Sequence, residues 1–329
     1  MPQIHNLITI GASAGGIKAL SRVVQGLSAN TNAAIMIVIH VSRFSNSKNI
    51  AEILQRHTEL KCMVAENSLE IKKGCIYIAP QDYHLMVNGS IMVINQGPQE
   101  NRYRPSIDVL FRSAAVHYRN QVIGIILTGM MDDGTSGMFA VKSCGGICIV
   151  QEPSDAEFAD MPQSVLNKIK VDYVATLDDI PLIVEDVLSK PLPQKIDVPT
   201  ELKVESEITE RLMSNIDDLK KIADRSDFVC PDCGGGLWAI KNDPSHRYRC
   251  HTGHVYNEKV LQELQDNKIE ESIWVSIRML EEKQNILRLA SGRNETRDNT
   301  NPGLSSSYAK RIEETGKHIE RLKSLLRKT

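Results

Sequence analysis

Short apolar runs, rich in β-branched residues, alternate with helically periodic segments over the first half of the chain. The runs occupy residues 4–10, 33–41, 75–80, 121–129 and 146–151. Consecutive apolar positions over this length suit strands that are buried on both faces of a sheet. Apolar residues recur instead with helical spacing at 17–27, 50–56 and 107–118. The alternation predicts an α/β fold with a doubly wound, largely parallel sheet.

One segment of this half has a different pattern. Residues 83–95 alternate about Asn88 and Gly89. Asn-Gly is a favoured two-residue sequence for a tight hairpin turn, because both residues tolerate positive φ. We therefore expect an antiparallel hairpin within the α/β pattern.

The pattern changes after residue 187. Residues 189–207 carry three prolines and many charges with little apolar periodicity, which is typical of a linker. A charged helix is expected over about 206–223, and a short segment rich in cysteine and histidine follows at 228–256.

The end of the chain has the pattern of a helical hairpin. Two helical stretches, about 258–290 and 305–326, are separated by a polar loop at 291–303. Their apolar residues suit packing of the two helices on each other. With 329 residues the chain exceeds a single core. We divide it into an α/β domain at 1–190, a linker with a charged helix at 191–226, a small module at 227–257 and a helical hairpin at 258–329.

Composition narrows the function classes. The chain has 39 Lys and Arg residues against 41 Asp and Glu, so no overall positive field would draw it to nucleic acid or anionic lipid. No apolar run approaches the ~18 residues that a membrane span needs, and the first residues do not resemble a signal peptide. The seven cysteines are an odd number, which fits a reducing compartment better than a disulfide framework. We expect a cytoplasmic protein without nucleic-acid binding or membrane insertion.

Three predicted strands are each followed by a residue of hydrolytic chemistry. Ser13 follows the first strand, His40 ends the second, and both Asp132 and Asp133 follow the run at 121–129. The carboxyl ends of parallel strands meet at one edge of a sheet. We therefore expect these side chains to lie together, as nucleophile, base and orienting carboxylate do in serine hydrolases.

The sequence around Ser13 has several interpretations. GASAG matches G-x-S-x-G, in which small neighbours let a serine sit exposed on a sharp strand-to-helix turn. A dinucleotide fingerprint would need glycine at position 13 and an acidic residue in place of His40. A phosphate loop would need Gly-Lys-Ser/Thr, which does not follow. A nucleophile or a helix cap is left, and the combination with His40 and the aspartates favours the nucleophile.

Five segments between residues 4 and 185 form an ordered set of motifs: IGASAGGIKAL, IVIHVS, YRPSIDVLFRSAA, ILTGMMDDGTSGM and QEPSDAEFADMP. In order and spacing they resemble the catalytic domain of the chemotaxis protein-glutamate methylesterases, the CheB family. The resemblance implies a Ser-His-Asp hydrolase that removes methyl esters from glutamate side chains of methyl-accepting chemoreceptors. Some members of this family also deamidate receptor glutamines, so the resemblance implies this as a possible second activity. No cofactor is implied for catalysis.

By motif position, the resemblance implies Ser13 as nucleophile, His40 as general base and Asp133, directly before Gly134, as the residue that orients the imidazole. It also implies the backbone N–H of Met130 as a donor to the oxyanion, with turn packing as the alternative role of this residue. N–H groups at the start of the helix after Ser13 are further candidates.

Three features depart from the family pattern. Many members have a hydroxyl residue and a glycine where this chain has Ala14 and Met131, and Met131 would be strained if the turn needs positive φ. The best-known members carry a receiver domain before the esterase. Here the first strand begins by residue 4, so we expect a receiver-less form without gating by an aspartyl phosphate in cis. The alternative function is a catalytically degenerate signalling adaptor that acts through the C-terminal extension.

The segment at 228–256 has the spacing of a zinc site. It contains Cys230, Cys233 and Cys250, with His251 and His254 as candidates for the fourth ligand. Two thiolates separated by two residues bind one tetrahedral cation from a knuckle turn. The gap after Cys250 gives His254 more room to reach the metal than the adjacent His251 has. We expect a zinc ribbon with one structural zinc, because four protein ligands leave no open position.

The strand 246–249 of this module is basic and aromatic, but the charge around it is balanced. We therefore interpret the module as an interaction module for other chemosensory proteins rather than for nucleic acid. Since a predicted linker separates the module from the α/β domain, we expect the esterase to keep its fold and activity without it.

Overall fold

The computed structural model of this chain describes residues 6–41, 46–192, 194–212, 215–295 and 302–327. The chain divides into two compact units, Met1–Val260 and Leu261–Thr329. Residues 4 and 5 of the first apolar run and residues 296–301 of the predicted polar loop lie outside the described residues.

A parallel sheet forms the centre of the first unit. Its strands are β1 (Asn6–Ala12), β2 (Ala33–Ile39), β3 (Lys61–Val64), β4 (Cys75–Ile78), β7 (Val122–Ile126), β8 (Ile147–Gln151) and β9 (Tyr173–Ala175). They pair in the order β3-β4-β2-β1-β7-β8-β9, and every pair is parallel. The strand order reverses at β1, between β2 and β7. In doubly wound sheets, ligands bind at this point, outside the carboxyl ends of the strands.

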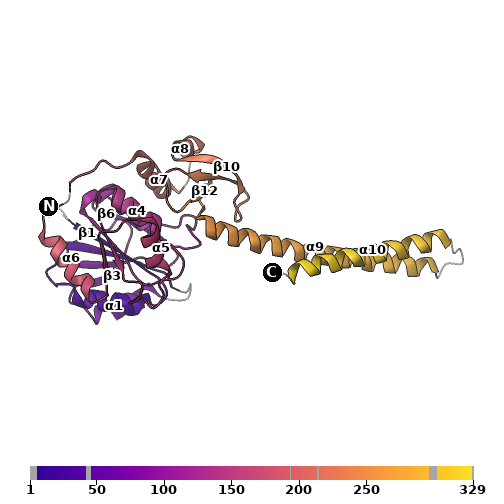
Figure 1. The fold of residues 1–329 in the computed structure, drawn as a ribbon, viewed down its shortest axis with the longest axis horizontal. Helices are drawn as coiled ribbons and strands as arrows, with labels where there is room; N and C mark the ends of the chain where they lie inside the picture. The colour runs from indigo at the N-terminus through magenta and orange to yellow at the C-terminus, as the bar shows by residue number, and fades with distance from the viewer. Residues whose placement is uncertain (1–5, 42–45, 193, 213–214, 296–301, 328–329) are drawn as a thin grey trace. The chain divides into compact units, whose positions relative to one another are not determined.

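Helices cover both faces of this sheet (Figure 1). One hydrophobic core lies between the sheet and α1 (Gly16–Gly26), α2 (Ser47–Gln55) and α6 (Asp179–Ser189). The other core lies between the sheet and α3 (Ile107–Tyr118), α4 (Thr135–Ser143) and α5 (Asp160–Lys168). A short 3-10 helix, η1 (Arg119–Gln121), follows α3. Every residue of β2 is buried, which explains its unbroken apolar sequence.

The predicted α/β class with a largely parallel sheet is confirmed. The apolar runs that follow the first strand are β2, β4, β7 and β8, and the three periodic segments are α1, α2 and α3. Residues around Asn88 and Gly89 form the antiparallel hairpin of β5 (His84–Asn88) and β6 (Ile91–Asn95). The pattern missed the two edge strands, β3 and β9, because they are short and partly exposed.

The segment after α6 is more structured than the sequence pattern predicted. Two helices, α7 (Thr200–Arg211) and α8 (Ile216–Ile222), replace the single charged helix expected at 206–223. α7 begins within the predicted linker and packs against α3. Its periodicity was hidden because three of its five buried residues, Glu205, Ser206 and Thr209, are polar.

A second sheet follows α8. Its strands β10 (Ala223–Val229), β11 (Gly236–Ile240), β12 (Tyr248–Cys250) and β13 (Val255–Tyr256) are antiparallel and paired in sequence order. We call residues 223–257 the ribbon. It belongs to the same compact unit as the α/β domain.

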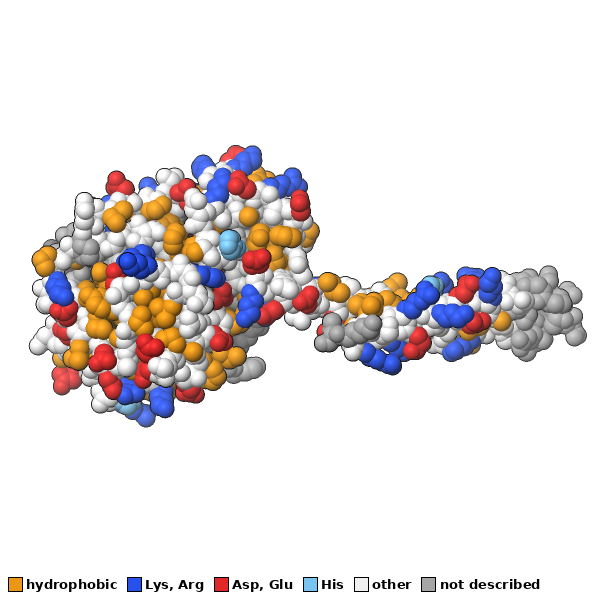
Figure 2. Space-filling model, viewed as in Figure 1, with side chains coloured by type: hydrophobic (Ala, Val, Ile, Leu, Met, Phe, Trp, Pro, Cys, Tyr) orange, Lys and Arg blue, Asp and Glu red, His pale blue; other side chains and the backbone are white. Residues whose placement is uncertain are grey.

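The second unit is a helical hairpin, as predicted, formed by α9 (Glu258–Glu295) and α10 (Pro302–Leu326). Gln284 donates to the carbonyl of Ile312 at 3.0 Å. The side chains buried between the helices include Ile277, Leu287 and Ile319. Ile286, the residue before the buried Leu287, is 66% exposed, because one residue along a helix turns the side chain by about 100°. Figure 2 shows hydrophobic and charged side chains interspersed along this hairpin.

Within the described residues, no helix has both the length and the apolar character that crossing a bilayer requires.

Candidate active site

Ser13 lies directly after β1, at the carboxyl edge of the sheet. Its N–H donates to the carbonyl of Thr128 at 3.0 Å, which joins the turn after β1 to the end of β7. Gly15 then adopts φ 73° and α1 begins at Gly16. In the described structure no side chain caps α1. The helix-cap alternative for Ser13 is therefore not supported.

The turn after β7 comes close to Ser13. A Cβ atom at Gly129 would lie 2.8 Å from Cβ of Ser13, so the position requires glycine. The Gly129 N–H donates to the carbonyl of Phe158 at 3.0 Å, which fixes the turn in place. The small residues of both turns thus bring the ends of β1 and β7 together.

His40 and Asp133 are in contact. His40 follows β2, and its N–H donates to the carbonyl of Ala12 at 3.0 Å. Its Nε2 lies 3.0 Å from Oδ2 of Asp133, and both side chains are almost fully buried. His40 Nε2 is therefore within ion-pair distance of the Asp133 carboxylate, but the two groups are not aligned as a linear hydrogen bond.

Asp133 is held by the start of α3. Its carboxylate accepts hydrogen bonds from the Ser106 hydroxyl at 3.0 Å and from the Ile107 N–H at 2.7 Å. Burial alone raises the pKa of Asp133, but the His40 imidazole and these two donors outweigh burial and lower the pKa below its usual value. Asp133 therefore faces His40 as a carboxylate.

The two neighbouring carboxyl groups behave differently. Burial raises the pKa of Asp132, whose partners are Asn257 at 2.6 Å and Lys168 at 3.8 Å. Burial and the nearby Asp133 carboxylate raise the pKa of Asp108 well above its usual value. Among the three, the pKa is lowered only for Asp133. When the pKa values of neighbouring carboxyl groups shift in opposite directions, the groups can take different catalytic roles.

The turn that carries the two aspartates contains a strained residue. Met131 adopts φ 67°, so this position does require the left-handed conformation that glycine tolerates best. The side chain of Met130 is 50% exposed. A half-exposed side chain contributes little to turn packing, which weakens that alternative for Met130.

A cavity of about 260 Å³ opens beside His40 and is also lined by Tyr103, Arg102 and Arg104. The Tyr103 ring stacks on the imidazole, with centroids 3.6 Å apart. Sequence reasoning did not single out Tyr103, although it opens the YRPSIDVLFRSAA motif. No spacing rule would have linked it to His40.

Ser13, His40 and Asp133 follow β1, β2 and β7, which are neighbours in the sheet and end at the same edge. The contact recorded among the three is that of His40 with Asp133. Among the described residues no hydrogen bond joins Ser13 to His40, and Nδ1 of His40 has no hydrogen-bond partner. Such contacts are often long in free enzymes and shorten when substrate binds.

The ribbon packs against the α/β domain through buried ion pairs. Arg247 pairs with Glu205 of α7 at 2.9 Å, and Arg249 pairs with Glu100 at 3.2 Å. Glu100 also pairs with Arg112 of α3 at 2.8 Å, and all five side chains are almost fully buried. The two arginines that we assigned to an interaction strand therefore lie inside the protein. The predicted linker does not hold the ribbon away from the α/β domain.

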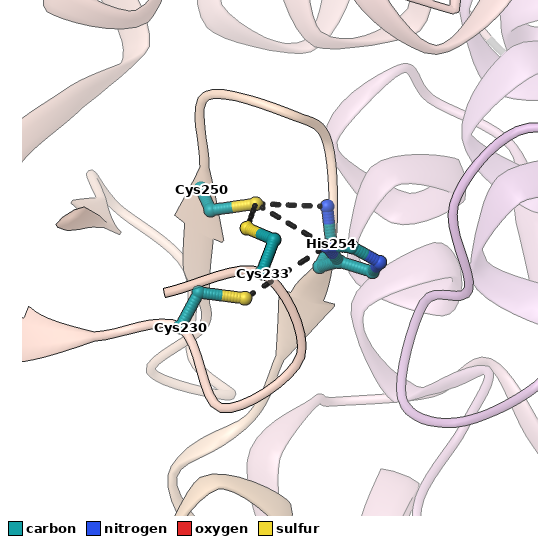
Figure 3. Close-up of side chains that lie close together, drawn as sticks. All are labelled: Cys230, Cys233, Cys250 and His254. Carbon is teal, nitrogen blue, oxygen red and sulfur yellow. Dashed lines mark hydrogen bonds between the residues drawn. The ribbon is translucent and has the colours of Figure 1, made fainter. Parts of the chain in front are cut away.

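The predicted metal ligands converge on one point of the ribbon (Figure 3). Ligand atoms of Cys230, Cys233, Cys250 and His254 all lie within 4.8 Å of one another. His251, the other candidate, is exposed and does not belong to this cluster. Gly234, with φ 73°, closes the turn after Cys233.

The distances in this cluster fit a tetrahedral metal site. Zinc bonds of about 2.3 Å to sulfur and about 2.05 Å to nitrogen imply edges of about 3.8 Å between sulfurs and about 3.5 Å from sulfur to nitrogen. Here Cys233 Sγ lies 3.7 Å from Cys250 Sγ. Nδ1 of His254 lies 3.5 Å from Cys250 Sγ and 3.8 Å from Cys230 Sγ. These four residues could hold zinc.

Comparison with known proteins places the α/β domain among methylesterases. The crystal structure of the Thermotoga maritima CheB methylesterase catalytic domain matches with a TM-score of 0.54 and 33% identity, over 55% of this chain and 97% of that domain. A Leptospira interrogans relative is 39% identical over 177 residues, which cover 54% of this chain and 91% of the relative.

Longer relatives match over the same part of the chain. The Salmonella typhimurium protein-glutamate methylesterase/protein-glutamine glutaminase is 36% identical over 54% of this chain and 51% of its own length. Its Thermotoga maritima namesake is 35% identical over 53% of this chain and 52% of its own length. The chain thus spans about half the length of these two relatives. The CheB methylesterase profile matches residues 8–184, and the chain belongs to the CheB methylesterase family.

Proposed function

We propose that this protein is a carboxyl methylesterase that hydrolyses γ-methyl esters of glutamate side chains in chemoreceptors, with Ser13, His40 and Asp133 as its catalytic triad. The observation that carries the proposal is the 3.0 Å contact of His40 Nε2 with Asp133 Oδ2, at the sheet edge where Ser13 follows β1. The names of the relatives support the ester substrate.

Each triad residue has a defined task in this reaction. A serine hydroxyl is a weak nucleophile, so His40 accepts the Ser13 proton as the oxygen attacks the ester carbonyl carbon. Since Nε2 faces Asp133, the proton goes to Nδ1. The Asp133 carboxylate orients the ring and stabilises its positive charge.

The tetrahedral intermediate collapses when the bond to the methoxy group breaks. His40 gives its proton to that oxygen, methanol leaves, and an acyl group stays on Ser13. A water molecule then attacks the acyl carbon while His40 takes its proton, and the same steps release glutamate and restore Ser13. Backbone N–H groups at Met130 and at the start of α1 are the donors that we assign to the oxyanion.

The same triad chemistry can release ammonia from a glutamine side chain. The relatives are named for both activities, and we include receptor glutamine among the substrates. Zinc would be structural, held by Cys230, Cys233, Cys250 and His254, and takes no part in ester cleavage. None of the seven cysteines forms a disulfide, which suits the reducing cytoplasm.

The test is release of methanol from a methylated chemoreceptor, and of ammonia from the same receptor with glutamine at those positions. We expect methanol release by the wild-type protein and loss of both reactions in Ser13→Ala. A folded wild-type protein that releases no methanol would contradict the proposal and favour the adaptor alternative.

A further inference from the structure

Asn257, the last residue of the ribbon, lies between two loops of the candidate active site. Its Nδ2 donates to Oδ1 of Asp132 at 2.6 Å. Its backbone N–H donates to Oδ1 of Asn101 at 3.0 Å. Its own Oδ1 accepts from the N–H of Val260 at 2.7 Å and so caps α9. Asn257 is 2% exposed.

Both contacts lead to the residues on either side of Asp133. The first ends on Asp132, the preceding residue. The second continues from Asn101, whose Nδ2 donates to Oδ2 of Asp108 at 3.2 Å. The other oxygen of Asp108 accepts from the N–H of Gly134, the following residue, at 3.0 Å. The turn around Asp133 is therefore held on both sides through Asn257.

The two loops that Asn257 joins contain unfavourable backbone conformations. Met131 has φ 67° in one loop, and Asn101 and Arg102 have φ 51° and 70° in the other. Non-glycine residues persist in this region only where their surroundings hold them. The second loop also carries Tyr103, which stacks on His40. Loosening either loop would move a group that contacts the imidazole.

We propose that Asn257 is a positioning residue that holds Asp133 and Tyr103 in register with His40, so that the ribbon is part of the esterase site. The inference rests on the proposed triad. Asn257 itself contacts neither His40 nor Ser13 and acts through Asp132 and Asn101.

The ribbon strand next to Asn257 supports this role. The N–H of Asn101 donates to the carbonyl of Val255 at 2.8 Å, and the N–H of Val255 donates to the carbonyl of Gln99 at 3.4 Å. β13 thus pairs with the loop that carries Tyr103. His254, one of the four clustered metal ligands, directly precedes Val255. The metal-binding turn and the loop beside His40 are therefore joined by backbone hydrogen bonds.

The test replaces the donor without removing the helix cap. Asn257→Asp keeps an oxygen for the Val260 N–H but sets a second carboxylate against Asp132. At pH 8 we expect kcat for methanol release to fall at least about tenfold, with KM within about twofold. Metal content should stay near that of the wild type, whereas the melting temperature should fall because a second carboxylate is buried beside Asp132.

A reciprocal exchange separates positioning from general destabilisation. In Asp132→Asn combined with Asn257→Asp, the amide and the carboxylate change places and the hydrogen bond can form again. We expect kcat of the double variant to return to within about threefold of Asp132→Asn alone. A double variant as slow as Asn257→Asp would overturn the proposal, and so would a single variant with wild-type kcat.

Two further variants control for the helix cap and for folding. Asn215→Ala removes the equivalent cap of α8, where the Asn215 side chain accepts from the Asp217 N–H, and should leave kcat unchanged. Asn257→Ser retains a capping oxygen but is too short to reach Asp132. It should lower kcat as Asn257→Asp does. If the aspartate variant folds poorly, Asn257→Ser tests whether loss of the hydrogen bond to Asp132 lowers kcat.

A spectroscopic measurement makes the result independent of substrate. An NMR resonance of the His40 imidazole, assigned by its loss in His40→Gln, should report the position of the ring against Tyr103 and Asp133. We expect this resonance to shift or broaden in Asn257→Asp and to recover in the double variant. An unchanged resonance overturns the inference even if the wild type hydrolyses no ester, whereas an inactive wild type overturns only the proposed function.

Discussion

The rings of Tyr103 and His40 lie face to face, with centroids 3.6 Å apart and planes 3° from parallel. The Tyr103 hydroxyl in turn contacts Met131 Sδ at 3.7 Å. Asp133 restrains the imidazole at Nε2 and Tyr103 restrains it on one face. Together they fix both the direction and the plane of a ring that must face Ser13.

This stack predicts a graded effect of substitutions at Tyr103. Tyr103→Phe keeps the ring and should retain activity within a few-fold. Tyr103→Ala frees one face of the imidazole and should lower kcat by about tenfold or more, because small misplacements of catalytic groups are costly. Steady-state methanol release measures both variants. Equal activity of Tyr103→Ala and wild type would show that the stack does not orient His40.

The two adjacent aspartates should respond very differently to the same change. Asp133→Asn removes the charge that faces His40 and should lower kcat by about 10³-fold to 10⁴-fold. Asp132→Asn keeps an oxygen that can accept from Asn257 and should cost only a few-fold. Both variants should melt within a few degrees of each other. The opposite ranking of kcat would mean that Asp132 is the triad carboxylate.

Much of the fold follows from local sequence pattern. Strand β2 was predicted from its consecutive apolar residues and helix α3 from its periodic ones, because these are the residues that the fold buries. The edge strand β9 has a buried, an exposed and a half-buried residue, so no apolar run marks it. Helix α7 was obscured by Glu205, which is buried because Arg112 and Arg247 neutralise it.

The candidate site was predictable only where a motif marks it. Ser13 and His40 stand at strand ends, and the rule that parallel strands end at one edge brings them together. Asn257 is 125 positions from Asp132 in the sequence, and no periodicity links the two. Arg249 and Glu100 are likewise far apart in the sequence, and no periodicity links them. Contacts between distant segments depend on how the ribbon packs, which local pattern does not contain.

The buried Glu100 predicts a pH-dependent stability. Burial raises the pKa of Glu100, but Arg112, Arg249 and Arg247 outweigh it and lower the pKa to about 2. A lowered pKa stabilises the fold above the unfolded value of about 4.3, and this stabilisation is lost as pH falls toward 2. Glu100→Gln should therefore cost about 3–5 kcal/mol at pH 7, and the difference from wild type should shrink below pH ~4.3.

Denaturant unfolding of both proteins at pH 7 and pH 3 measures this difference. Glu207→Gln is the matched control, because Glu207 lies on the exposed face of α7 and pairs with Arg211 at 3.1 Å. Exposed pairs contribute little, so its effect should be small at both pH values. A Glu100→Gln effect that is the same at both would contradict the lowered pKa.

Zinc should be required for the ribbon and, through it, for the esterase site. Cys233→Ser should abolish zinc binding and unfold the ribbon, since metal binding supplies the folding free energy of such modules. From sequence we expected the esterase to be independent of this module. The burial of Arg247 and Arg249 against Glu205 and Glu100 instead predicts a loss of activity.

Elemental analysis and methanol release of the same preparations test this prediction. Cys62→Ser, at a half-buried thiol on β3, is the control and should keep zinc and activity. A wild-type protein that stays metal-free after purification with zinc would refute the metal site. Full activity of zinc-free Cys233→Ser would refute the dependence of the esterase on the ribbon.

The most direct test of the proposed triad is methanol release from a methylated chemoreceptor by wild type, Ser13→Ala and Ser28→Ala. Ser28 follows the opposite end of α1, far along the helix from Ser13, and serves as the matched control. We predict that wild type and Ser28→Ala release methanol at the same rate and that Ser13→Ala is slower by about 10⁴-fold or more. Comparable release by Ser13→Ala would contradict the account.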